Sequence, residues 1–182
     1  MTERELSIKL REDARRMNLC DKWYNEWDDD TSMQELIEKY IRGNDFCFQH
    51  RWPSNSFIKA HFPQEILRKN GILVDDVRSF PVRDEDTRRQ IYLKDFILLG
   101  KSEATIRYSF SKNMCNVWVR DNSKVRVFAK YGAFVVVHLF DNSHADVTTD
   151  SVTNATVIRH SRNATVSKDG NVKVKDEFDY LD

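Results

Sequence analysis

The sequence is poor in the residues and motifs that mark many familiar classes of protein. Its 182 residues include five glycines, three prolines and three cysteines. Cys20, Cys47 and Cys115 are odd in number and widely spaced, which does not indicate a disulfide framework and predicts reduced thiols. The sequence contains no glycine-rich phosphate loop, no nucleophile elbow and no closely spaced set of metal ligands. We therefore expect a protein that is not an enzyme and that holds no cofactor or metal.

Long apolar runs are missing as well. No stretch approaches the roughly 18 apolar residues of a membrane span. The first ten residues, MTERELSIKL, do not have the charged-then-apolar pattern of a secretory leader. The expected location is the cytoplasm, without contact to a membrane.

An excess of charge of one sign is absent from the chain as a whole, with 29 basic and 29 acidic residues. A strong nucleic-acid binder would be expected to carry a global positive field. The charge is nevertheless sorted along the sequence. Residues 1–74 carry 12 basic and 13 acidic side chains, residues 101–175 carry 12 and 6, and the last seven carry 0 and 4.

Residues 1–74 have the pattern of a bundle of four or five short helices. Thr2 with Glu5 and Ser32 with Glu35 are capping-box pairs, each followed by apolar residues at helical spacing. Gly43 and Gly71 are placed to end helices. Short helices are poorly stable alone, so a shared core is expected around Trp23, Trp27, Phe46 and Phe57.

The helical region also contains residue types found in structural zinc sites: Cys20, Cys47, His50 and His61. Only Cys47 and His50 are close in sequence, and a zinc signature would need a second close pair. Buried cysteines and surface histidines explain the same residues, so no metal site is predicted.

Residues 75–90 are dense in both charges and contain Pro81, which predicts a connector between two domains. The run IYLKDFILLG that follows is rich in β-formers and ends at Gly100. We expect it to be the strand that opens the second domain, residues 91–175.

That second domain repeats a short theme. It contains seven pairs of small or branched apolar residues, and a single residue separates the two members of each pair. The pairs are Val117/Val119, Val125/Val127, Val135/Val137, Ala145/Val147, Ala155/Val157, Ala164/Val166 and Val172/Val174. Corners such as DNS, YGA and DGN separate them, and Asn, Asp and Gly tolerate the left-handed backbone of tight turns. Equal repeats of strand and corner predict stacking into a small single-stranded β-helix, that is, a β-solenoid.

The fold class is therefore α+β, with a β-sandwich as the alternative to the solenoid. One repeat of about ten residues is too short to enclose two sheet faces about 10 Å apart, so one coil should hold two repeats. Residues about 20 apart then become vertical neighbours. Phe140 should stack near His160, and His138 near Ile158.

Both ends of such a stack need covers, because open strand edges invite pairing. The helical domain can cap one end. Residues 176–182, DEFDYLD, place Phe178 and Tyr180 among acidic residues and are interpreted as an acidic tail or cap over the last coil. A docking tail for a basic partner is the other interpretation.

Two segments carry a resemblance that covers most of the chain. The region LCDKWYNEW with ELIEKYIRGNDFCFQHRWPSNSFIKAHF, and repeats of the type DNSKVRVFAKYG, resemble uncharacterised proteins of phages, prophages and other mobile elements of gut bacteria. The resemblance implies a mobile-element setting. It brings no activity and no catalytic residues.

The function expected from these patterns is that of a non-enzymatic interaction or assembly protein with a protein partner, able to self-associate. The alternative is a nucleic-acid-binding accessory protein that uses the basic excess of the repeats, with few aromatics beyond Tyr108, Phe128 and Tyr131. Its candidate donors are Arg107, Arg120, Lys124, Arg126, Lys130, Arg159 and Arg162. A carbohydrate-active β-helix enzyme is less expected, with His138, His144, His160, Asp141, Asp146 and Asp150 as the residues from which a His–Asp pair could arise.

Overall fold

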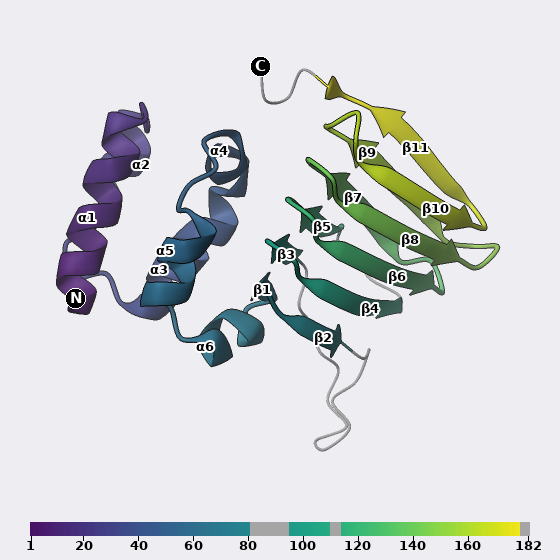
Figure 1. Ribbon diagram of the computed structural model, residues 1–182, viewed down its shortest axis with the longest axis horizontal. Coiled ribbons are helices and arrows are strands. Elements are labelled where there is room, and N and C mark those ends of the chain that lie inside the picture. The colour runs from purple at the N-terminus through teal and green to yellow at the C-terminus, as the bar shows by residue number, and fades with distance from the viewer. Residues whose placement is uncertain (81–94, 110–113, 179–182) are drawn as a thin grey trace. The chain divides into compact units, whose positions relative to one another are not determined.

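The computed structural model describes residues 1–80, 95–109 and 114–178 and divides the chain into two compact units, Met1–Leu67 and Arg68–Asp182 (Figure 1). The first unit is helical and the second is built from parallel strands. This confirms the α+β class with a helical region followed by a β-solenoid.

The described residues form six helices where the sequence predicted four or five. They are α1 (Glu3–Arg16), α2 (Asp21–Asn25), α3 (Met33–Arg42), α4 (Asn44–Gln49), α5 (Asn55–His61) and α6 (Gln64–Lys69). Both predicted capping boxes are present, at Thr2 with Glu5 and at Ser32 with Glu35. The helix that the sequence analysis missed is α4, because Gly43 ends α3 and at once begins α4.

The core of the helical unit differs in part from the predicted aromatic one. Trp27 is buried, and its indole N–H donates to the Ser7 hydroxyl at 3.0 Å. Trp23 is only half-buried and lies against the guanidinium of Arg42, 4.9 Å from the ring centroid. The fully buried aromatic ring of α4 is that of Phe48. The predicted Phe46, two residues earlier on the same helix, is only half-buried. Aliphatic residues on α1, α3, α5 and α6 are buried in this unit as well.

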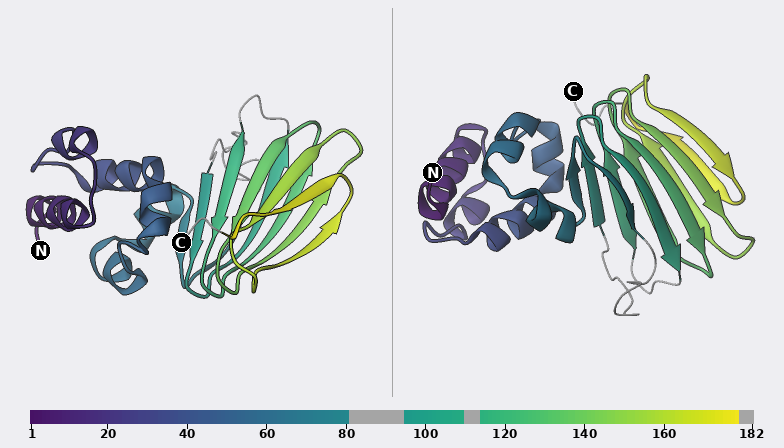
Figure 2. Two further views of the ribbon diagram at one scale, coloured as in Figure 1. Left: turned by 90° about the horizontal axis from the view of Figure 1, so that it is seen from above. Right: turned by 60° about the horizontal axis from the view of Figure 1, so that its bottom comes forward.

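The second unit consists of two parallel sheets. The strands are β1 (Ile72–Val74), β2 (Val77–Phe80), β3 (Asp95–Leu99), β4 (Glu103–Ser109), β5 (Cys115–Val119), β6 (Lys124–Lys130), β7 (Phe134–Leu139), β8 (His144–Thr149), β9 (Asn154–Arg159), β10 (Thr165–Asp169) and β11 (Val172–Asp176). Odd-numbered strands form a six-stranded sheet and even-numbered strands a five-stranded one, face to face in Figure 2. Every pairing between described strands is parallel, whereas a β-sandwich is built from antiparallel sheets. The solenoid interpretation is confirmed and the sandwich is excluded.

One coil holds two strands, as the length of the repeat required. Val117 pairs with Val137, and Val137 with Val157, so vertical neighbours along β5, β7 and β9 are 20 residues apart. Both predicted neighbours are found. His138 pairs with Ile158, and the rings of Phe140 and His160 stack with centroids 4.4 Å apart.

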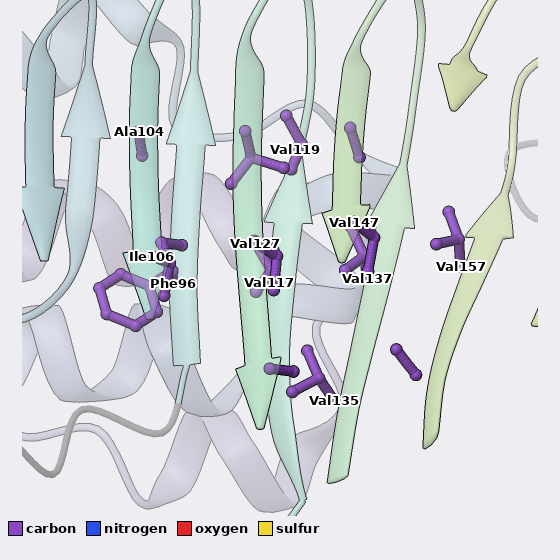
Figure 3. Close-up of a cluster of buried hydrophobic side chains, with 14 of the residues drawn as sticks. Phe96, Ala104, Ile106, Val117, Val119, Val127, Val135, Val137, Val147 and Val157 are labelled. Atoms are coloured by element: carbon purple, nitrogen blue, oxygen red, sulfur yellow. The ribbon is translucent and has the colours of Figure 1, made fainter. Parts of the chain in front are cut away.

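The space between the sheets is filled by the predicted apolar pairs (Figure 3). Their members are mostly Val or Ala, which suits a narrow interior, and nearly all are fully buried. Val166 and Val174 are the exceptions, because they lie in the last coil and have no coil above them. Larger residues, such as Phe96 and Ile106, lie in the first coils.

Corners between the sheets are held by bonds from one coil to the next. Asp121 and Asp141 adopt the left-handed backbone, with φ of 63° and 54°. The Asp121 carboxylate accepts the N–H of Gly100 at 2.7 Å, and the Asp141 carboxylate accepts the N–H of Asp121 at 3.2 Å. The aspartates of the DNS corners therefore act as vertical links as well as turn residues.

The solenoid begins earlier than residue 91. The sequence predicts residues 72–74 as part of the helical domain and 75–90 as a connector, but β1 and β2 already pair with β3 and β4. Both strands are short and lack the Val/Ala repeat, so the local sequence does not mark them as strands. They are strands because they pair with β3 and β4, which lie further along the sequence. The rest of the predicted connector, residues 81–90, lies outside the described residues.

The predicted tail also begins inside the solenoid. Asp176 is the last residue of β11, in register with Arg159. Phe178 is half-buried, and the guanidiniums of Arg159 and Arg162 lie 5.8 and 5.0 Å from its ring centroid. Tyr180 lies outside the described residues.

Candidate binding face of the five-stranded sheet

The outward side of the five-stranded sheet is polar. Alternate residues of β6 point inward as Val125, Val127 and Ala129, so the residues between them point out of the solenoid. We call this surface the polar face and define it as the outward side chains of β2, β4, β6, β8 and β10. Three columns of vertical neighbours make up most of it: Glu103, Lys124, His144 and Thr165; Thr105, Arg126, Asp146 and Ser167; Arg107, Phe128, Thr148 and Asp169.

The basic residues singled out in the sequence do not form one patch. Four of the seven, Arg107, Lys124, Arg126 and Lys130, share the polar face. The other three lie elsewhere. Arg120 is 4% exposed in a corner beside the Asp121 carboxylate, and Arg159 forms two hydrogen bonds of 2.7 Å with Asp176. Arg162 is in another corner, beside Phe178.

The three aromatics that accompany the basic residues are separated in the same way. Tyr108 points inward and is 8% exposed, and Tyr131 lies in a corner. Phe128 alone lies on the polar face, where it is half-buried. The guanidinium of Arg107, its neighbour on β4, lies 5.2 Å from its ring centroid. An arginine and an aromatic ring thus form a small platform beside the other cations.

A shallow hollow of about 180 Å³ lies at one end of the polar face. Its charged and polar lining comes from four neighbouring strands: Arg78, Glu103, Thr105, Lys124, Arg126, His144 and Asp146. Arg78, Glu103 and Thr105 are not among the residues that the sequence patterns predict for a site. The spacing of two residues along a strand and about 20 between coils would have placed Glu103 and Thr105 beside Lys124 and Arg126.

His144 links two neighbours on the polar face. Its Nδ1 lies 2.8 Å from Thr165 Oγ1 and its Nε2 lies 3.1 Å from Asp146 Oδ1. A hydroxyl, an imidazole and a carboxylate in line are also the parts of an acyl-transfer triad. Acyl transfer further needs free N–H groups aimed at the reacting carbonyl. Because β8 lies between β6 and β10, ladder bonds occupy its N–H groups. The register of β8 with β10 places Thr165 beside His144, and Asp146 follows His144 by two residues on the same strand. These three contacts therefore need no catalytic explanation.

The other carboxylates considered for catalysis serve the corners. Asp150 accepts the Tyr131 N–H at 2.7 Å. Hydrogen bonds from the Thr153 hydroxyl and then from the Tyr131 N–H lower the pKa of Asp150. Asp141 links two coils, as described above. Both carboxylates accept hydrogen bonds from backbone N–H groups of the neighbouring coil.

His138 and His160 belong to a stack of four rings on the outside of the six-stranded sheet. Trp118 and His138 are stacked at 4.0 Å and 7°, and Phe140 and His160 at 4.4 Å and 17°. Burial, followed by the nearby His160, lowers the pKa of His138 to about 4. Burial also lowers the pKa of His160, although the Glu177 carbonyl acts in the opposite direction. These imidazoles are therefore neutral at pH 7 and lie away from the polar face.

The four residues with zinc-ligand chemistry are dispersed. Cys20 is exposed, and Cys47 is buried in α4. His50 and His61 lie against phenylalanine rings, each with centroids 4.4 Å apart. Within residues 1–80, 95–109 and 114–178, no three His, Cys, Asp or Glu side chains are close enough to hold a metal ion together.

Comparisons of this chain with protein-family models, with curated proteins and with solved structures found no match. In the described part of the chain, no helix has the length and apolar character needed to cross a membrane.

Proposed function

We propose that this protein is a non-enzymatic interaction or assembly protein that binds a partner through the polar face. The observation that carries the proposal is the gathering of four cations and a hollow on one regular, outward sheet surface. In the described residues the side chains of Lys124, Arg126 and Lys130 form no ion pair, so their charges are available to a partner. The mobile-element setting implied by the sequence resemblance, and a cytoplasmic location, belong to the same proposal.

Binding accounts for these residues better than catalysis does. A catalytic site needs reactive groups that converge in a desolvated pocket. His144 and Asp146 lie in an open hollow, with side chains 29% and 42% exposed. His138, which is half-buried, and His160, which is buried, contact each other and the Glu177 carbonyl instead of a cavity.

The C-terminal end of the solenoid is less suited to binding a second copy. Lys168 of β10 takes an inward position, in register with Val147, and Lys173 and Lys175 flank Val174 on β11. Inward-pointing charges and edge lysines oppose the addition of another strand. We therefore assign binding to the polar face and expect this end to stay unpaired.

The test is affinity capture from a native host lysate with the full chain and two charge-matched variants. Lys124→Glu with Arg126→Glu alters the polar face, and Lys173→Glu with Lys175→Glu makes the same charge change on β11. A partner that is captured by the wild type and the β11 variant, and lost from the polar-face variant, supports the proposal. Equal capture by all three proteins would refute it.

A further inference from the structure

The strand at the centre of the polar face presents a regular row of cations. We call Lys124, Arg126 and Lys130 of β6, with Phe128 between them, the β6 row. Outward residues of one strand repeat every second residue, about 6.6 Å apart. Neither Lys124, Arg126 nor Lys130 forms an ion pair with any described residue, although Glu103 and Asp146 are in register with two of them. Three cations thus lie along one line, none of them in a direct ion pair with a described residue.

The neighbouring strands limit where an anionic ligand can lie. Glu103 of β4 and Asp146 of β8 flank the start of the β6 row on either side. A broad polyanion such as a duplex would meet these carboxylates, because it covers several strands. A narrow anionic chain that follows β6 would lie between the Glu103 and Asp146 carboxylates and not over them. The charge pattern therefore selects a ligand one strand wide.

Arg107 adds a stacking surface to the row. Its guanidinium lies over Phe128, 5.2 Å from the ring centroid, and its Nη1 is 3.4 Å from Ser79 Oγ. Arginine planes and aromatic rings are the surfaces on which unpaired bases stack. An acidic peptide would use the cations but has no need of such a platform.

We infer that the β6 row binds a single strand of nucleic acid, with neighbouring phosphates at Lys124 and Arg126, a base stacked at Arg107 and Phe128, and the next phosphate but one at Lys130. Phosphates of an unstacked strand repeat at about 7 Å, roughly twice the 3.4 Å of a stacked strand. One repeat matches the roughly 6.6 Å from Lys124 to Arg126, and two repeats match the roughly 13 Å from Arg126 past Phe128 to Lys130. The inference rests on the proposed function, since it names the partner of the same face.

The experiment is fluorescence anisotropy with the full chain and labelled 20-nucleotide oligo(dT) and oligo(U), over a range of salt concentrations. We expect binding at low salt that weakens as salt rises. Lys124→Gln with Arg126→Gln should reduce the log–log salt slope by about 1.4, from roughly 0.7 per phosphate contact. Phe128→Ala should weaken binding roughly tenfold with the slope unchanged, because stacking releases no counterions.

Controls separate this inference from its rivals. Lys173→Gln with Lys175→Gln removes the same charge from β11 and should leave affinity and slope unchanged. A duplex of equal length and polyglutamate should both bind at least tenfold more weakly than oligo(dT). Thermal unfolding of each variant checks that its fold is intact.

Three results would overturn the inference. Polyglutamate binding as tightly as oligo(dT) would identify the row as a surface for acidic protein. Equal losses in the β11 control would show that the effect comes from net charge. If no oligonucleotide binds at low salt while the polar-face variant still loses a protein partner from lysate, the inference fails and the proposed function stands.

Discussion

His138 Nδ1 and His160 Nε2 lie 3.1 Å apart, on rings that are 6° from parallel. His160 Nδ1 lies 3.2 Å from the carbonyl oxygen of Glu177 and must donate to it, because a carbonyl can only accept. The neutral His160 ring therefore accepts at Nε2, and His138 donates from Nδ1. The stack thus connects β7 with the chain after β11 through two neutral imidazoles.

This arrangement predicts that the solenoid loses stability in acid. Burial, followed by His160, lowers the pKa of His138 to about 4 from 6.5, so between these values the unfolded chain binds more protons than the folded chain. Stability is then complete above pH 6.5 and falls as the pH drops toward 4, by up to about 3 kcal/mol. Urea unfolding at pH 7 and pH 4.5 measures the change. His138→Phe should flatten this dependence, whereas exposed His50→Gln should not. An unchanged profile in His138→Phe would contradict the assignment.

Adjacent residues of β9 should respond differently to a new carboxylate. Val157 is fully buried between the sheets, so Val157→Asp would bury an unpaired charge and cost several kcal/mol. Thr156 points outward and is in register with Lys173, so Thr156→Asp should change stability by less than about 0.5 kcal/mol. Chemical denaturation compares the two variants. Equal losses would show that the inside and outside of this strand are wrongly assigned.

Gly100 should tolerate a methyl group less well than Gly132. Both have positive φ, 72° and 77°, so each substitution to alanine costs about 1–2 kcal/mol for the left-handed backbone alone. A Cβ at Gly100 would also collide with the Asp75 carboxylate, while nothing lies within 4 Å of one at Gly132. We expect Gly100→Ala to lower the melting temperature clearly more than Gly132→Ala. The reverse order would contradict the corner geometry.

The lysines at the last coil should keep the chain from adding strands there. Replacing Lys168 by Val and Lys173 and Lys175 by Thr removes the inward charge and both edge charges. Light scattering should then show a rise in apparent mass. Threonine at Lys124, Arg126 and Lys130 removes equal charge from an interior strand and should leave the mass unchanged. An unchanged apparent mass in the first variant would mean that these lysines do not prevent strand addition at this edge.

Much of the solenoid could be predicted from local sequence. The alternation of small apolar residues identifies strands and their inward side, because side chains of a strand alternate between faces. Asp, Asn and Gly at the corners mark the turns, since they accept left-handed backbone. The length of the repeat then requires two strands per coil, and this was enough to place Phe140 beside His160 and His138 beside Ile158.

The makeup of the polar face required the tertiary structure. Local pattern shows that Arg126 and Lys173 both point outward, but it does not show that their strands belong to different sheets. The sheet to which a strand belongs depends on its pairing with strands about 20 residues away. The first two strands, β1 and β2, lack the Val/Ala pairs, so the sequence does not show where the alternation between the two sheets begins. Only the assembled ladders separate Arg107, Lys124, Arg126 and Lys130 from Arg159, which Asp176 neutralises, and from Arg120, which a corner buries. The sequence alone thus determined the coil and its interior, and the long-range pairing decided which charges share a surface.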